Sequence, residues 1–246
     1  MLDWSTISKT DDKIKTYKIR LFYEYFNEDL RSEVEIRKNA NLKFTNEELL
    51  TLAYQMIETL AKMEMEGLNH GEVSSKFMFY SSDRKFKLCE MMKQRSRYPN
   101  NIIKKWVLLN FTLIFRINSD LEVYVSPEIL KCINQRDMSN FQNTDRFKND
   151  VFCLGMTLIE LGILKSLTKV ITKDRLFDIP LLKKYFEQFK MEYKNNKLLI
   201  SLVEKMIEIT PQTRPTFVGK MLTFRSHHVL TFIWKNSGKI WTSTKK

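Results

Sequence analysis

The stretch DVFCLGMTLIELGI, residues 150–163, is apolar on nearly every side when it is placed on a helix. A helix at the surface of a protein carries one apolar stripe, whereas a helix that is apolar all round is surrounded by other elements. We therefore predict a helix buried in the middle of a domain. The apolar run over 151–164 contains Glu160 and is too short to cross a bilayer, so no membrane span is expected.

A second helix is predicted by its start signal. Thr45 and Glu48 have the spacing of a capping box, in which the hydroxyl and the carboxylate each accept a hydrogen bond from a backbone N–H at the helix start. Apolar residues then recur at helical spacing until Gly67, so we expect a helix over 46–66. Similar patterns predict strands over 17–25 and 107–117, a hairpin over 78–88 with its turn at 81–84, and helices over 181–193, 196–208 and 216–225. The expected fold class is mainly α (α+β).

The composition is that of an ordinary globular protein of 246 residues, with 43% hydrophobic and 28% charged residues. A chain of this length buries a sizeable core. The formal charge of +12 would suit a polyanion, but Lys and Arg are spread along the whole chain, which is typical of a solvated lysine-rich surface. A basic nucleic-acid-binding module is the alternative, because residues 231–241 interleave aromatic and basic residues.

Cysteine usage and the first residues indicate a cellular compartment. The three cysteines, at positions 89, 132 and 153, stand far apart and include no C-x-x-C pair. Neither a zinc ribbon nor a disulfide framework is predicted, and a reducing compartment is expected. The first residues contain acids and no apolar signal segment. We therefore expect an intracellular protein, cytoplasmic or nuclear, without membrane partners.

A series of short motifs follows one another along the chain. They are, in order, HGE at 70–72, KLCE at 87–90, YVSPE at 124–128, KNDVFCLG at 148–155 and Thr-Arg-Pro at 213–215. In this order they resemble the C-terminal lobe of a eukaryotic protein kinase of the Ser/Thr type, over about residues 17–224. The combination is specific, whereas each motif alone occurs by chance in many chains. The resemblance implies a protein-kinase-like C-lobe with a buried central helix, short hairpins and a truncated N-terminal lobe.

The resemblance also implies how the chain is divided. It assigns remnant N-lobe strands and the hinge to residues 1–26, the kinase-like C-lobe to 27–224, and a basic aromatic tail to 225–246. Glu24, Tyr25 and Phe26 stand at the hinge, where a nucleotide cofactor would bind in the family. Only about 23 residues precede this hinge. We therefore expect this chain to lack the Gly-rich loop and the phosphate-pairing lysine that cover ATP in kinases.

Four residues match structural anchors of the family. The resemblance implies that Glu128 pairs with Arg214 in a bidentate ion pair that ties the activation segment to the lower helices. It also implies that Asp150 accepts hydrogen bonds from the backbone of the catalytic loop around His70 and Gly71. These anchors hold the scaffold together and take no part in chemistry.

The positions that carry chemistry in the family hold other residues in this chain. Glu72 stands at the catalytic aspartate, and its extra methylene displaces the carboxylate by about an ångström, which can cost roughly a hundredfold in rate. Ser74 replaces the loop lysine and removes a cation near the transferred phosphoryl group. Phe77 replaces the asparagine and offers no oxygen to magnesium, while Glu90 stands at the metal-binding aspartate. Neither magnesium nor ATP is therefore expected as a cofactor.

These observations favour a catalytically inactive protein-kinase-like domain, a pseudokinase, that acts as an interaction or regulatory scaffold for other proteins. The alternative from the enzyme class is a weakly active or fragmentary ATP-dependent Ser/Thr protein kinase that relies on Glu72 and Glu90. The nucleic-acid-binding module is the second alternative. The expected partners are proteins, because the basic residues do not gather into one segment.

Overall fold

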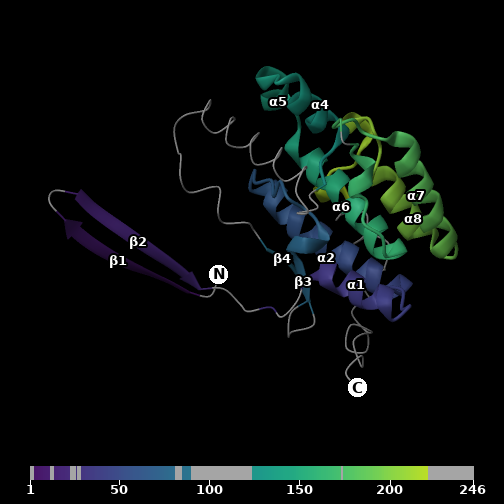
Figure 1. The fold of residues 1–246 in the computed structure, drawn as a ribbon, viewed down its shortest axis with the longest axis horizontal. Coiled ribbons are helices and arrows are strands. Elements are labelled where there is room, and N and C mark those ends of the chain that lie inside the picture. Colours follow the sequence, from purple (N-terminus) through teal and green to yellow (C-terminus); the bar gives the residue numbers. More distant parts are fainter. Residues whose placement is uncertain are drawn as a thin grey trace.

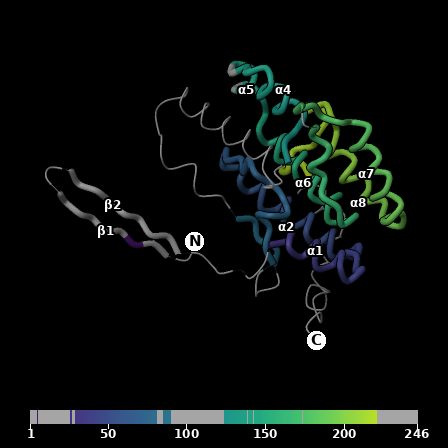
Figure 2. Tube along the Cα trace, viewed as in Figure 1, coloured from purple at the N-terminus to yellow at the C-terminus, as the bar shows by residue number. Residues whose placement is uncertain are grey.

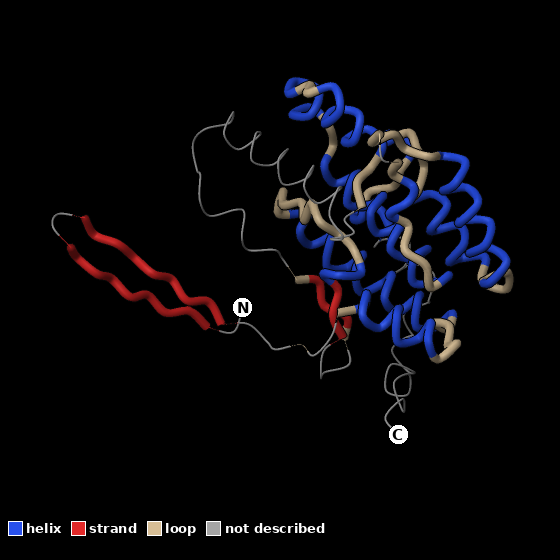
Figure 3. Tube along the Cα trace, viewed as in Figure 1, coloured by secondary structure: helices blue, strands red, loops and turns tan. Residues whose placement is uncertain are grey.

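The protein is described from a computed structural model. The described residues are 3–11, 14–22, 26, 29–80, 85–89, 124–172 and 174–220. Several predicted features lie outside them: the strand over 107–117, the turn at 81–84, the tail over 225–246, and the residues Glu24, Tyr25 and Glu90. The described part is mainly helical, with small antiparallel sheets, as the sequence predicts (Figure 3).

Helix α6, Arg146–Ile163, lies at the centre of the helical body and contacts α2, α7 and α8 (Figure 1). The predicted buried helix is confirmed, because every residue over 149–163 is buried. The helix begins before the apolar run, since the Asp145 carboxylate accepts hydrogen bonds from the backbone N–H groups of Phe147 and Lys148. It ends at Leu164, which adopts a left-handed backbone with φ of 53°. No helix in the described part of the chain is long and apolar enough to cross a membrane.

Helix α2, Asn46–Met65, confirms the predicted capping box. The Thr45 hydroxyl accepts from the Glu48 N–H at 3.2 Å, and the Glu48 carboxylate accepts from the Thr45 N–H at 2.7 Å. Helix α1, Leu30–Asn39, was not predicted. Its Arg37 donates to both carboxylate oxygens of Glu48 and lies 4.0 Å above the Phe44 ring, so it ties α1 to the start of α2.

Helices α7, Ile179–Glu192, and α8, Lys197–Met206, pack against α6 on one side of the body. Both agree with the predicted ranges to within about two residues. Gly162 lets α7 approach closely, because an added Cβ there would lie 2.5 Å from Cε2 of Phe189. Residues 217–220 are helical, which is the described part of the helix predicted over 216–225.

The strands in the described part of the chain form two separate antiparallel pairs. Strands β3, Met78–Tyr80, and β4, Phe86–Leu88, confirm the predicted hairpin. Strand β2, Ile14–Phe22, covers most of the predicted strand over 17–25, but its partner β1, Asp3–Asp11, was not predicted. In the views of Figures 1 and 2 the β1–β2 hairpin lies apart from the helices.

A smaller cluster of helices lies beside the N-terminal half of α6. Helix α4, Pro127–Gln135, begins with a proline at its first turn, and helix α5, Met138–Asn143, follows directly. Their buried residues form a satellite core beside the main one. Three short 3₁₀ turns complete the described elements: η1 Ser75–Phe77, η2 Thr168–Val170 and η3 Pro211–Thr213.

Candidate functional site

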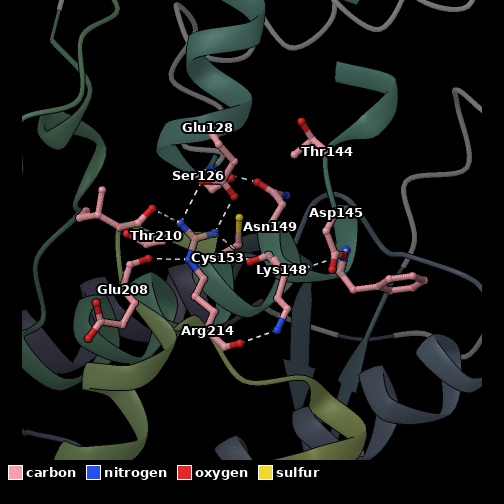
Figure 4. A network of polar contacts seen from close by, with 12 residues as sticks. Ser126, Glu128, Thr144, Asp145, Lys148, Asn149, Cys153, Glu208, Thr210 and Arg214 are labelled. Atoms are coloured by element: carbon pink, nitrogen blue, oxygen red, sulfur yellow. Dashed lines mark hydrogen bonds and ion pairs between the residues drawn. The ribbon is translucent and has the colours of Figure 1, made fainter. Parts of the chain in front are cut away.

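The Arg214 side chain lies at the junction of η3, α4 and α6 (Figure 4). It is wholly buried, and its guanidinium meets the Glu128 carboxylate with two parallel hydrogen bonds, Nη1 to Oε1 at 2.5 Å and Nη2 to Oε2 at 2.9 Å. The guanidinium also lies 4.7 Å from the ring centroid of Phe152. The ion pair that the resemblance implies is therefore present, with Arg214 fully buried and Glu128 partly exposed.

The remaining donors of Arg214 are used by backbone carbonyls. Nε donates to the Glu208 carbonyl at 2.5 Å, Nη2 to that of Ile209 at 2.9 Å, and Nη1 to that of Lys148 at 3.2 Å. In return, the Lys148 ammonium donates to the Arg214 carbonyl. A buried guanidinium is costly unless its donors are paired, and here one side chain joins three segments of the chain with all donor groups engaged.

Asp150, near the start of α6, holds the segment that resembles a catalytic loop. Its Oδ2 accepts from the His70 N–H at 2.7 Å and its Oδ1 from the Gly71 N–H at 2.8 Å. Asp150 is 1% exposed, so these bonds replace water around its carboxylate. Gly71 has a φ of 82°, a conformation that residues with a side chain rarely adopt. The contact implied by the resemblance is present at both amides.

The His70 ring connects this loop to the end of β4. Its Nδ1 accepts from the Glu72 N–H at 3.3 Å, and its Nε2 lies 3.1 Å from the Cys89 carbonyl. Because a backbone N–H can only donate, Nδ1 carries no proton and Nε2 donates to the carbonyl. The neutral ring therefore fixes the loop at Glu72 relative to the segment that leads to position 90.

The loop positions with predicted chemical roles are partly or fully buried. Glu72 is half-buried. Ser74 is 1% exposed, and its hydroxyl has no hydrogen-bond partner within the described part of the chain. Phe77 lies in η1 with 8% of its surface exposed, and its backbone bonds with Ser74 and Cys89. The loop thus keeps its backbone contacts, while positions 74 and 77 present a hydroxyl and an aromatic ring.

The described residues cover one of the two positions at which the resemblance places a magnesium ligand. The resemblance puts one metal ligand at position 77, where the Phe77 ring offers no oxygen to a hard cation. The other position, Glu90, lies outside the described residues. Within the described ranges, His, Cys, Asp and Glu form no group of three or more that could hold a metal ion.

Of the three predicted hinge residues, only Phe26 is described. Its ring stacks at a tilt against that of Phe79 in β3, with 5.0 Å between the centroids. Next along the chain, Asp29 forms a β-bridge with Phe79 and caps α1 through the Ser32 N–H. Phe26 is therefore packed on the β3–β4 hairpin, and a nucleotide-binding role for it stays a prediction.

Sequence reasoning missed a buried polar group around Glu160. Arg31 in α1 donates to its Oε1 at 2.6 Å, and Glu160 is 1% exposed in the last turn of α6. Burial, together with the nearby Glu160 charge, raises the pKa of the Tyr124 phenol well above its ordinary value. Glu160 was itself a signal in the sequence, because an acid inside a helix that is apolar all round requires a cation or a hydrogen-bond donor as its partner. The partner could not be inferred, since Arg31 stands 129 positions away.

This chain matches no family model and no curated protein sequence. What is established is a mainly helical body around α6, with small antiparallel sheets. Inference about its function therefore starts from the contacts of Arg214, Asp150 and the loop over 70–77.

Proposed function

We propose that this chain is a protein-kinase-like C-terminal lobe that does not transfer phosphoryl groups and acts as an interaction or regulatory scaffold for other proteins. One observation carries the proposal. Asp150 holds the backbone of the loop at His70 and Gly71, yet the same loop buries Ser74 and Phe77 where the family has a lysine and an asparagine. The supports of a catalytic loop are thus combined with side chains that cannot perform its chemistry.

The chemical argument follows from what phosphoryl transfer needs. Kinases act by positioning the reactants and by neutralising charge on the phosphoryl group, for which cations and metal-bound oxygens are required. Ser74 brings no charge, and Phe77 has no atom that could ligand magnesium. Glu72 retains a carboxylate, but Ser74 and Phe77 supply neither the cation nor the metal ligand with which kinases neutralise charge on the phosphoryl group.

The scaffold argument follows from the anchors. The Glu128–Arg214 pair and the Asp150 hydrogen bonds link segments that are 86 and about 80 positions apart. A buried charge with unpaired groups would destabilise the fold, so these contacts support a stable and specific surface. A stable domain that catalyses no reaction would act by binding other proteins.

Nucleotide binding and phosphoryl transfer by the full chain test the proposal. A thermal-shift titration with ATP, with and without magnesium, is expected to show no shift, whereas a ligand at about 100 times its dissociation constant would stabilise the fold by roughly 2.7 kcal/mol. Incubation with magnesium and labelled ATP is expected to label neither the chain nor a generic protein substrate.

Two variants define the result that would contradict the proposed lack of phosphoryl transfer. A magnesium-dependent thermal shift, with labelling that Glu72→Gln abolishes, would replace the scaffold by the weakly active kinase. Glu66→Gln is the matched control, because Glu66 is an exposed acid just before the loop. Labelling that both variants keep would trace to a contaminating kinase and would leave the chain inactive.

A further inference from the structure

Within the described strands, the outer edge of β2 in the β1–β2 hairpin has no strand partner. Its nine residue pairs run from Asp3–Phe22 to Asp11–Ile14, and within the described strands β2 pairs with β1 alone. An edge strand leaves every second N–H and C=O directed away from its partner, ready to pair with another strand. An isolated two-stranded hairpin is only marginally stable in water, so a third strand would also stabilise it.

Charge distinguishes the two strands of this hairpin. Strand β2 has the sequence IKTYKIRLF, with the cations Lys15, Lys18 and Arg20 and no acid. Strand β1 has the sequence DWSTISKTD, with an acid at each end and one lysine. Lys18 and Arg20 are two positions apart and therefore belong to the same face of the strand. The β2 edge thus combines backbone groups that pair with no other described strand and a local excess of positive charge.

We propose that the β2 edge binds an extended acidic segment of a partner protein, which adds to the hairpin as a third strand. Acids opposite Lys18 and Arg20 would be separated by one residue, because cross-strand neighbours repeat every two positions. Backbone hydrogen bonds supply the affinity of such a complex, and the acid-x-acid spacing supplies its specificity. This inference rests on the proposed scaffold function and names the chemistry of its partner.

A second copy of the chain fits this edge poorly. Pairing β2 with another β2 would bring six cations together, three from each strand, and like charges across a sheet are destabilising. In β1 the acids Asp3 and Asp11 are eight positions apart, so no register can place both opposite Lys18 and Arg20. The charge pattern therefore favours a different chain with closely spaced acids.

The test uses the full chain and defined peptides. The probe is a fluorescently labelled valine- and threonine-rich peptide with two glutamates separated by one residue, and its binding is followed by fluorescence anisotropy. We expect saturable binding, and weakening by about tenfold or more when both glutamates are replaced by lysine. The same acidic peptide with N-methylated backbone amides is expected not to bind, because it cannot pair with a strand edge.

Protein variants locate the binding site. Lys18→Glu with Arg20→Glu is expected to lose the acidic peptide and to gain the lysine peptide. The matched control is Lys183→Glu with Lys184→Glu, an equal change of charge at exposed positions of α7, which should leave binding unchanged. Slower amide hydrogen exchange within 14–22 on peptide addition would show directly that β2 acquires a partner.

Each contrary outcome has its own meaning. Binding of the N-methylated peptide, failure of the charge swap, or no binding at all would overturn strand addition. Displacement of the peptide by a single-stranded oligonucleotide that binds more tightly would replace the acidic segment by a nucleic acid. None of these results affects the absence of phosphoryl transfer, and labelling that depends on Glu72 would refute that absence whatever the peptide does.

Discussion

Two parts of the molecule are both attached to the first turns of α6, but they use their polar groups differently. Around Arg214 every donor group has an acceptor, and the side chain joins three segments without contact with water. In the loop over 70–77 the backbone is equally well held by Asp150, yet the Ser74 hydroxyl is buried without a described partner and Phe77 is an apolar ring. All Arg214 donor groups thus have acceptors, whereas Ser74 in the loop keeps a buried hydroxyl without a described partner, as does Ser126, two residues before Glu128.

The two regions differ in the free energy that is lost when a buried polar group has no partner. A buried charge that loses its partner costs several kcal/mol, whereas a buried hydroxyl without a partner costs about 1–3 kcal/mol and can be tolerated. If the loop no longer has to bind phosphate and metal, its side chains can change within that smaller range. The Arg214 contacts do not have this freedom, because the fold itself depends on them.

The largest effect is expected at Arg214. Arg214→Ala should lower the free energy of unfolding by about 3–5 kcal/mol, because it leaves the Glu128 carboxylate and three carbonyls without their donor. Urea denaturation measures the change. Lys131→Ala, at an exposed position of α4, is the control and should change stability by less than about 0.5 kcal/mol. A loss below about 1 kcal/mol for Arg214→Ala would show that the network contributes little to the fold.

An intermediate effect is expected at Asp150, which holds the loop at His70 and Gly71. Asp150→Asn replaces one accepting oxygen by an NH₂ group that faces a backbone N–H, so the fold should lose about 1–3 kcal/mol. Amide exchange at His70 and Gly71 should accelerate more than exchange within α2. Asp137→Asn is the control, since asparagine caps a helix as well as aspartate does. Unchanged exchange at the two amides would mean that the loop is held by other contacts.

The smallest change in stability is expected when a buried hydroxyl is removed, and its sign should differ between Ser74 and Thr157. Ser74→Ala removes a hydroxyl without a described partner, so stability should stay unchanged or rise by up to about 1 kcal/mol. Thr157→Val removes a hydroxyl that donates to the Cys153 carbonyl at 2.8 Å, and stability should fall by about 0.5–1.5 kcal/mol. Equal losses at both positions, measured by the urea midpoint, would show that Ser74 is held as firmly as Thr157.

Local signals in the sequence predicted most of the regular elements. The capping box at Thr45 set the start of α2, and the unbroken apolar run identified α6 as the buried helix. Helix α1 was missed because only Leu30 and Val34 of its ten residues are buried, too few to show a period. Strand β1 was missed because its alternation of small polar residues carries no hydrophobic pattern.

For the candidate site, the sequence located the residues but not their surroundings. The resemblance implied that Glu128 pairs with Arg214 and that Asp150 holds the loop, and the structure contains both sets of contacts. The ring tautomer of His70 and the contact of Phe26 with Phe79 could not be foreseen, because both depend on groups brought together by folding.

By itself, the sequence determined the start of α2, the buried central helix and the side chains available at positions 72, 74 and 77. Only the tertiary structure decided that Arg214 is wholly buried with all its donor groups engaged, and that Arg31 pairs with Glu160 inside the body. The physical reason is distance along the chain. Caps and periods depend on neighbours three or four residues apart, whereas burial of a charge depends on partners 86 or 129 positions away.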